Sequence, residues 1–186
     1  MGQENAALLN FEVVSAREVP STTSIEILEC WDRARGAKIA PEYGVDFFLD
    51  DLRLDIVPSI SIVDVIDGGK DYSYRFWGSL NGAIKGFEMT GKRLSEGPFD
   101  EFKRFGYDQF TEIIFQRKPL TFTYYGPYKS SVRRRQVTSR FPFSSDGESI
   151  DVILSCQNLE QQSDEWTILF EAIRDEMTTK SESSDS

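Results

Sequence analysis

The hydrophobic pattern of this chain changes period near residue 59, and that change most limits how the chain can fold. Residues 59–66 are rich in β-branched side chains, and residues 71–77 alternate between two sets of side chains. Asp67-Gly68-Gly69, between these segments, is typical of a tight hairpin turn. The pattern therefore predicts two antiparallel strands. Their alternation places Tyr72, Tyr74 and Phe76 on one face and Ser73, Arg75 and Trp77 on the other.

Two other segments have the residue spacing of amphipathic helices. Residues 21–35 begin with three hydroxyl side chains that can cap a helix, and Gly36 follows them as a stop. Residues 99–117 show the same spacing and end before Pro119. The first helix carries an apolar stripe, which must be buried against the sheet of its own chain or against a second copy. This stripe, a candidate dimer interface, consists of Ile25, Leu28 and Trp31.

The remaining pattern completes a mixed fold. Glycines interrupt short apolar runs over residues 78–97, which suits short helices and turns. Residues 120–125, 132–143 and 150–157 have the composition of strands. The predicted order is therefore two strands, a helical crossover and three antiparallel strands, which is an α+β fold.

The length and composition fit one domain. The chain has 186 residues, of which 39% are hydrophobic, enough for a core. We expect a helical extension over residues 1–57 and the core over residues 58–160. A C-terminal segment over residues 161–174 can be helical. Ser, Thr, Asp and Glu dominate residues 175–186, so we expect a disordered acidic tail there.

The composition also excludes several classes of function. The chain contains no histidine, which removes His-ligated haem, His-containing zinc sites and Ser-His or Cys-His catalytic pairs. Its 21 basic and 31 acidic side chains give a net charge of −10. Binding to nucleic acid or to an anionic membrane requires clustered basic residues, so we expect neither as a partner. No metal site is predicted, because the acidic residues show no calcium-loop pattern.

The two cysteines and the hydropathy indicate a compartment. Cys30 and Cys156 lie far apart without a CxxC motif, which favours free thiols in a reducing cytosol over a disulfide. No signal peptide is visible, and no apolar run reaches the roughly 18 residues of a membrane span. We therefore expect a cytoplasmic protein.

Several short motifs occur in an order known from one fold family. Trp31 precedes Gly36 and Pro41, and residues 72–79 read YSYRFWGS. Three further motifs are GFEMTG at 86–91, FPFSSDG at 141–147 and IDVI at 150–153. Over residues 25–160 the chain resembles a PAS domain, and more specifically a bacterial family of small stand-alone PAS-like proteins. Each motif is weak alone, and the resemblance is carried by their order and spacing.

The resemblance implies a fold and a general role. It implies a five-stranded antiparallel sheet with helices on one face, which in many PAS domains enclose a ligand pocket. Such domains sense ligands or redox state, or they dock to other proteins. No cofactor is identified. Haem bound through histidine is excluded, and the corresponding stretch Asn81-Gly82-Ala83 lacks the reactive thiol of flavin photochemistry.

The choice of candidate ligand-binding residues depends on which side chains of each strand point toward the helices. Aromatic side chains on several strands either form an ordinary core or line a small-molecule pocket whose Tyr hydroxyls hold a polar ligand group. Arg135, in a basic cluster at 133–135, could grip a carboxylate, although such a cluster also suits a solvated sheet edge. The candidate ligand-binding residues are Tyr74, Phe76, Asn81, Phe115, Tyr124, Arg135 and Phe141.

These features favour a sensory or signalling module over an enzyme. We expect a small organic ligand in an aromatic pocket, a homodimer and contacts with a signalling partner, without an attached effector segment. The alternative is a ligand-free docking or dimerisation module. An enzyme is not expected, because no nucleophile and base form a recognisable pair; turnover that depends on Cys156 would revive that possibility.

Overall fold

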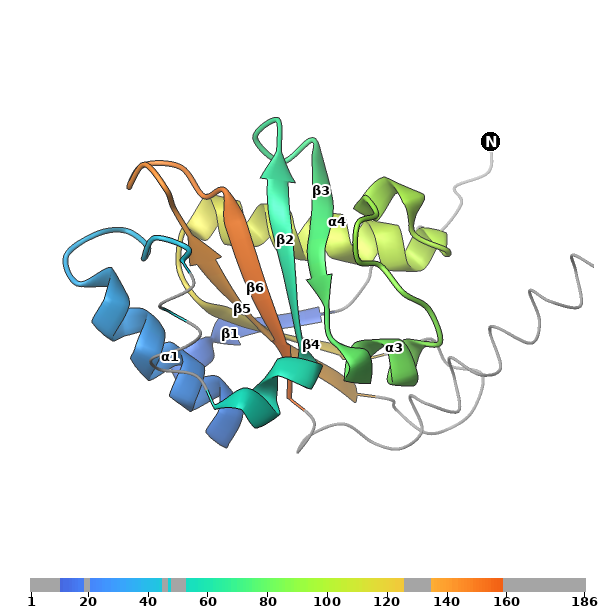
Figure 1. Ribbon diagram of the computed structural model, residues 1–186, viewed down its shortest axis with the longest axis horizontal. Helices are drawn as coiled ribbons and strands as arrows, with labels where there is room; N and C mark the ends of the chain where they lie inside the picture. Colours follow the sequence, from blue (N-terminus) through green and yellow to red (C-terminus); the bar gives the residue numbers. More distant parts are fainter. Residues whose placement is uncertain (1–10, 19–20, 45–46, 48–52, 126–134, 159–186) are drawn as a thin grey trace, which may run out of the picture.

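A computed structural model describes residues 11–18, 21–44, 47, 53–125 and 135–158. Within these residues an antiparallel sheet of six strands forms the centre of the molecule, in the order β1-β4-β5-β6-β2-β3 (Figure 1). The strands are β1 (Phe11–Ser15), β2 (Ile60–Ile66), β3 (Asp71–Trp77), β4 (Leu120–Tyr125), β5 (Arg135–Phe143) and β6 (Val152–Gln157). The α-helices are α1 (Thr22–Arg35), α3 (Ser79–Lys85) and α4 (Asp100–Gln116), and short 3-10 helices are η1 (Ala16–Glu18), η2 (Leu54–Ser59) and η3 (Leu94–Glu96).

The α+β class and the order of the main elements are confirmed. Two hairpin strands, a helical crossover and three antiparallel strands follow one another along the chain. The turn between β2 and β3 has positive φ at Asp67, Gly68 and Gly69, as a tight hairpin requires. The sheet differs from the predicted five strands, because β1 pairs with β4 as a sixth strand. This pairing satisfies backbone groups that β4 would otherwise present at an open edge.

The N-terminal segment is therefore joined to the sheet, although we expected a helical extension over residues 1–57. Its strand β1 runs antiparallel to β4, with Val13 opposite Phe122. The predicted segments at 161–174 and 175–186 lie outside the described residues, as does part of the extension.

Helices lie on both faces of the sheet, which corrects the prediction that they cover one face. Ser24 of α1 donates a hydrogen bond to Ser139 of β5 over 2.8 Å. The next residue, Arg140, donates to Gln109 of α4. Because neighbouring residues of a strand point to opposite faces, α1 and α4 lie on opposite sides of the sheet. Figure 1 shows α4 passing behind β2, β6 and β3. We call the two sides the α1 face and the α4 face.

A register shift in β3 overturns part of the predicted alternation. Val63 lies opposite Tyr74 and Ile62 lies opposite Phe76, so Arg75 is an extra residue in β3. Such a bulge reverses the facing of every residue after it. The Trp77 ring therefore packs on Tyr74, with 5.1 Å between ring centroids. Phe76, predicted to share a face with Tyr74, is on the opposite face.

Helix α1 packs on its own sheet, and this decides the role of the apolar stripe. Ser21 caps the helix by accepting a hydrogen bond from the Ser24 amide, and Gly36 ends it with positive φ. Trp31 donates from Nε1 to the carbonyl of Pro142 in β5 over 2.6 Å. Leu28 and Trp31 are buried, so neither is available to a second copy, whereas Ile25 is 39% exposed.

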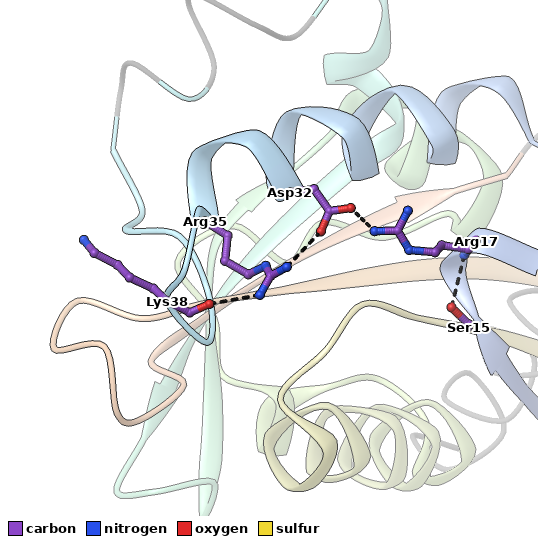
Figure 2. Close-up of polar contacts among 5 residues, drawn as sticks. All are labelled: Ser15, Arg17, Asp32, Arg35 and Lys38. Carbon is purple, nitrogen blue, oxygen red and sulfur yellow. Dashed lines mark hydrogen bonds and ion pairs between the residues drawn. The ribbon is translucent and has the colours of Figure 1, made fainter.

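An ionic cluster on the outside of α1 holds the corner between β1 and the helix (Figure 2). The Asp32 carboxylate accepts from Arg17 of η1 and, at 3.5 Å, from Arg35. Arg35 also donates to the carbonyl of Lys38 over 3.1 Å, just beyond the helix. The cluster joins the segment after β1 to the end of α1.

Candidate functional site

A buried arginine is the main polar feature of the α4 face. Arg140 of β5 is only 7% exposed, and its guanidinium carbon lies 4.3 Å from the centroid of the Phe110 ring. Its Nε and Nη2 donate to Gln109 Oε1 over 2.9 and 2.6 Å, and Nη1 donates to Ser155. Burial lowers the pKa of Arg140 to about 10. All these acceptors are neutral, and no carboxylate pairs with Arg140 among the described residues.

Gln109 adds a second donor next to the arginine. Its side chain is fully buried, and Oε1 accepts from Arg140. Its Nε2 has no hydrogen-bond partner in the described part of the chain. A buried donor without an acceptor costs about 1–3 kcal/mol, so such groups usually meet a water or a ligand. Arg140 and Gln109 together thus present more donors than the surrounding protein accepts.

A buried lysine lies on the same face. Lys85, the last residue of α3, is 9% exposed. Its Nζ lies 5.1 Å from the Trp77 centroid and 5.6 Å from the Phe102 centroid. Burial and, second, the charge of Arg140 lower the pKa of Lys85 to about 7. Within the described residues Lys85 has no carboxylate partner and no hydrogen-bond acceptor.

The Tyr74 ring packs against aromatic rings near Arg140 and near Lys85. Its ring centroid lies 5.1 Å from that of Trp77, 6.3 Å from that of Phe102 and 6.5 Å from that of Phe110. Burial raises the pKa of Tyr74, and the nearby charge of Arg140 partly opposes that rise. No hydrogen bond joins the Tyr74 hydroxyl to another of the residues that the structure describes.

Asn81 supplies the acceptor on this side. It lies one helical turn before Lys85 on α3, so the two side chains share a helix face. Its Nδ2 donates to the Ile60 carbonyl over 2.9 Å, while its buried Oδ1 has no partner among the described atoms. We call the five residues Arg140, Gln109, Lys85, Tyr74 and Asn81 the cationic site.

One carboxylate holds helix α4 over β3 and so positions the site. Asp71, the first residue of β3, accepts from the Tyr107 hydroxyl over 2.9 Å and from the Ser95 hydroxyl over 2.7 Å. Burial alone would raise the pKa of Asp71, but its hydrogen bonds outweigh burial and lower it. Its charge is thus matched by these donors.

The structure brings only part of the predicted site together. Tyr74 and Asn81 belong to the cationic site. Phe141 is fully buried on the α1 face, because it follows Arg140 in the strand. Phe115 is 81% exposed on α4, so it lines no buried site. Phe76 faces away from Tyr74 because of the bulge.

Two further predictions concern side chains outside the described part. Tyr124 and Arg135 have backbone positions in β4 and β5, but their side chains are not described. Arg140 is the arginine of β5 whose described side chain faces α4, since it donates to Gln109.

The sequence analysis missed Arg140, Gln109 and Lys85 as site residues. The alternation of β5 predicted that Arg140 and Phe141 lie on opposite faces of the sheet. It could not show which face is buried, and helices cover both. The spacing of Asn81 and Lys85 was a weak signal, because a lysine at a helix end is usually solvated.

Other reactive or structural groups lie away from this site. Cys30 and Cys156 are buried thiols, and neither is part of a disulfide. Burial raises the pKa of Cys156 to about 12, although Ser59 nearby lowers it slightly. The described residues contain no group of His, Cys, Asp or Glu that could hold a metal ion. No helix among them is long and apolar enough to cross a membrane.

Comparisons with models of known protein families and with curated proteins give no match for this chain. The site is therefore interpreted from its own residues.

Proposed function

We propose that this chain is a PAS-like binding module whose cationic site holds a small organic anion. One observation carries the proposal: two buried cations lie on the α4 face, and no described carboxylate pairs with either. A buried charge without a counter-charge costs several kcal/mol, so a carboxylate arriving with a ligand would relieve that cost. Arginine suits this role because its fork of donors matches the two oxygens of a carboxylate.

The walls of the site favour an organic anion over a simple inorganic ion. Aromatic rings surround both cations, and their faces offer apolar contact to the body of a ligand. Tyr74 and Asn81 supply a free hydroxyl and a free carbonyl oxygen to orient its polar groups. We propose a non-catalytic role, since a thiol with a pKa near 12, such as that of Cys156, is not a nucleophile at neutral pH.

Signalling would then proceed through contacts with another protein or a second copy. Helix α4 supports this view, because it supplies Gln109 and Phe110 to the site and exposes Phe115 on its other side. A ligand that shifts α4 would therefore change a surface that carries an exposed aromatic ring.

Native mass spectrometry of the freshly purified chain is the first test, with its denatured mass as reference. We expect an additional mass of an organic acid that leaves on denaturation. The second test is thermal unfolding with sodium benzoate, which should raise the Tm of the wild type and not that of Arg140→Met. Arg104→Met, at an exposed position of α4, is the matched control. A bare native mass together with an unchanged Tm in benzoate, acetate and phosphate would contradict the proposal.

A further inference from the structure

A single negative group cannot neutralise both Arg140 and Lys85 when the lysine is in its ammonium form. Arg140 and Lys85 are both buried, and each is surrounded by aromatic rings and neutral polar groups. A monocarboxylate bound to Arg140 would neutralise only one of these charges. The amine of Lys85 would still lack an acceptor among the described residues, apart from the faces of Trp77 and Phe102.

Arg140 and Lys85 pack against different aromatic rings, and the Tyr74 ring contacts both sets of rings. Arg140 packs on Phe110, and Lys85 packs on Trp77 and Phe102. The Tyr74 ring contacts all three aromatic side chains. A ligand that reached both cations would therefore pass along an aromatic wall, which suits a short hydrocarbon spacer.

We propose that the site selects a small dicarboxylate, with one carboxylate held by Arg140 and Gln109 and the other by Lys85. This inference rests on the proposed function and names its ligand class. Gln109 Nε2, the buried donor without a partner, would complete the binding of the first carboxylate. Asn81 Oδ1 and the Tyr74 hydroxyl would hold a hydroxyl substituent on the spacer.

Binding of a dicarboxylate should also change the number of protons bound to the protein. The groups that bear on Lys85 are the Arg140 charge from β5, the Trp77 ring from β3 and the Phe102 ring from α4. In the empty site burial and Arg140 keep the pKa of Lys85 at about 7, so the amine is mostly neutral at pH 8. A carboxylate beside it favours the ammonium form. Binding should then take up roughly 0.5–1 proton at pH 8 and almost none at pH 6.

Isothermal titration calorimetry of the full chain tests the inference. Succinate, glutarate and adipate scan the spacer length, and butyrate is the monocarboxylate reference. Titrations in Tris and triethanolamine, which differ in ionisation enthalpy, report the protons taken up. We expect at least one dicarboxylate to bind tenfold tighter than butyrate, with proton uptake at pH 8. Lys85→Met should remove that preference and the uptake, whereas exposed Lys92→Met should change neither.

The failures of the two proposals are distinguishable. Equal binding of butyrate and the dicarboxylates, without proton uptake, would overturn the dicarboxylate assignment and leave the anion site. Binding and proton uptake by inorganic phosphate alone, equal to that of the best dicarboxylate, would also overturn it. Absence of binding by every probe would overturn both. Lys85→Gln, whose fold is checked by circular dichroism, replaces Lys85→Met if the methionine variant fails to fold.

Discussion

Burial determines the chemistry of the residues in the cationic site. Arg140 and Lys85 are ordinary basic residues in the sequence, yet both are removed from water and both have a lowered pKa. The Arg140 charge is hydrogen-bonded to neutral groups only, so it belongs to no ion pair among the described residues. Arg140→Met removes a buried charge together with its hydrogen bonds to Gln109 and Ser155, so circular dichroism checks its fold before ligands are added.

The titration of Lys85 predicts a pH dependence of stability. Its pKa is about 7 in the folded chain and 10.5 as the ordinary value, so the unfolded state binds more protons between these limits. The free energy of unfolding should therefore rise with pH from about 7 to 10, by an amount on the order of a few kcal/mol. Lys85→Met should lose this rise. Urea unfolding of both proteins at several pH values measures it, and parallel curves would contradict the prediction.

Cys156 should be unreactive in the native protein. Its thiol is fully buried and its pKa is raised to about 12, so almost no thiolate is present at pH 8. Iodoacetamide should modify this position only after unfolding, which peptide mass spectrometry can measure. Modification of the folded chain at a rate near that of a free thiol would show that β6 opens readily.

At the scale of elements, α1 is held to the sheet by a buried polar network as well as by apolar packing. The Ser24 hydroxyl donates to Ser139 and contacts Asn158, which follows β6. Asn158 in turn accepts from Ser21 and donates to Ser139, each over 3.0 Å. Buried networks of this kind contribute only when each member is satisfied.

Removing one member of this network should destabilise the docking of α1. Ser24→Ala deletes a buried hydroxyl and its hydrogen bonds to Ser139 and Asn158. Both partners keep other hydrogen bonds, so we expect a cost of about 1 kcal/mol. Glu29→Ala, at an exposed position of the same helix, should cost less than about 0.5 kcal/mol. Urea denaturation compares the variants. Equal losses at the two positions would show that the network contributes nothing.

The whole molecule has a sheet covered on both faces, with β1 and β3 at its edges within the described residues. The homodimer stays a prediction, but this arrangement limits which surface a second copy could contact. Leu28 and Trp31 belong to the core of their own chain, and only Ile25 of the stripe is partly exposed. A second copy would therefore need a surface other than the stripe.

Two substitutions on α1 separate these roles. Ile25→Glu should leave both the fold and the oligomeric state unchanged, because its side chain already meets solvent. Leu28→Glu should unfold the chain, because it places a charge in the core. Native mass spectrometry counts the subunits and circular dichroism follows the fold. A dimer that Ile25→Glu dissociates would restore the stripe as an interface.

Much of the fold follows from local sequence, because turns and periodicity act over a few residues. The turn at Asp67-Gly68-Gly69 requires positive φ, and Gly36 and Pro119 limit the helices before them. These signals were enough to predict α1, α4 and the β2–β3 hairpin, as well as the order of the later strands. The alternation of residues 71–77 also placed Tyr74 among the candidate ligand-binding residues, which stay a prediction.

Only the tertiary structure decided on which face of the sheet each side chain lies. One extra residue at Arg75 moves Trp77 to the α4 face and Phe76 away from it, and β1 joins the sheet across more than a hundred residues of sequence. Helices on both faces leave Arg140 only 7% exposed and Phe141 fully buried. The sequence by itself thus determined which elements form, because their signals are local. The placement of Lys85 and Arg140 on one face of the sheet depends on packing between distant elements, which no local pattern records.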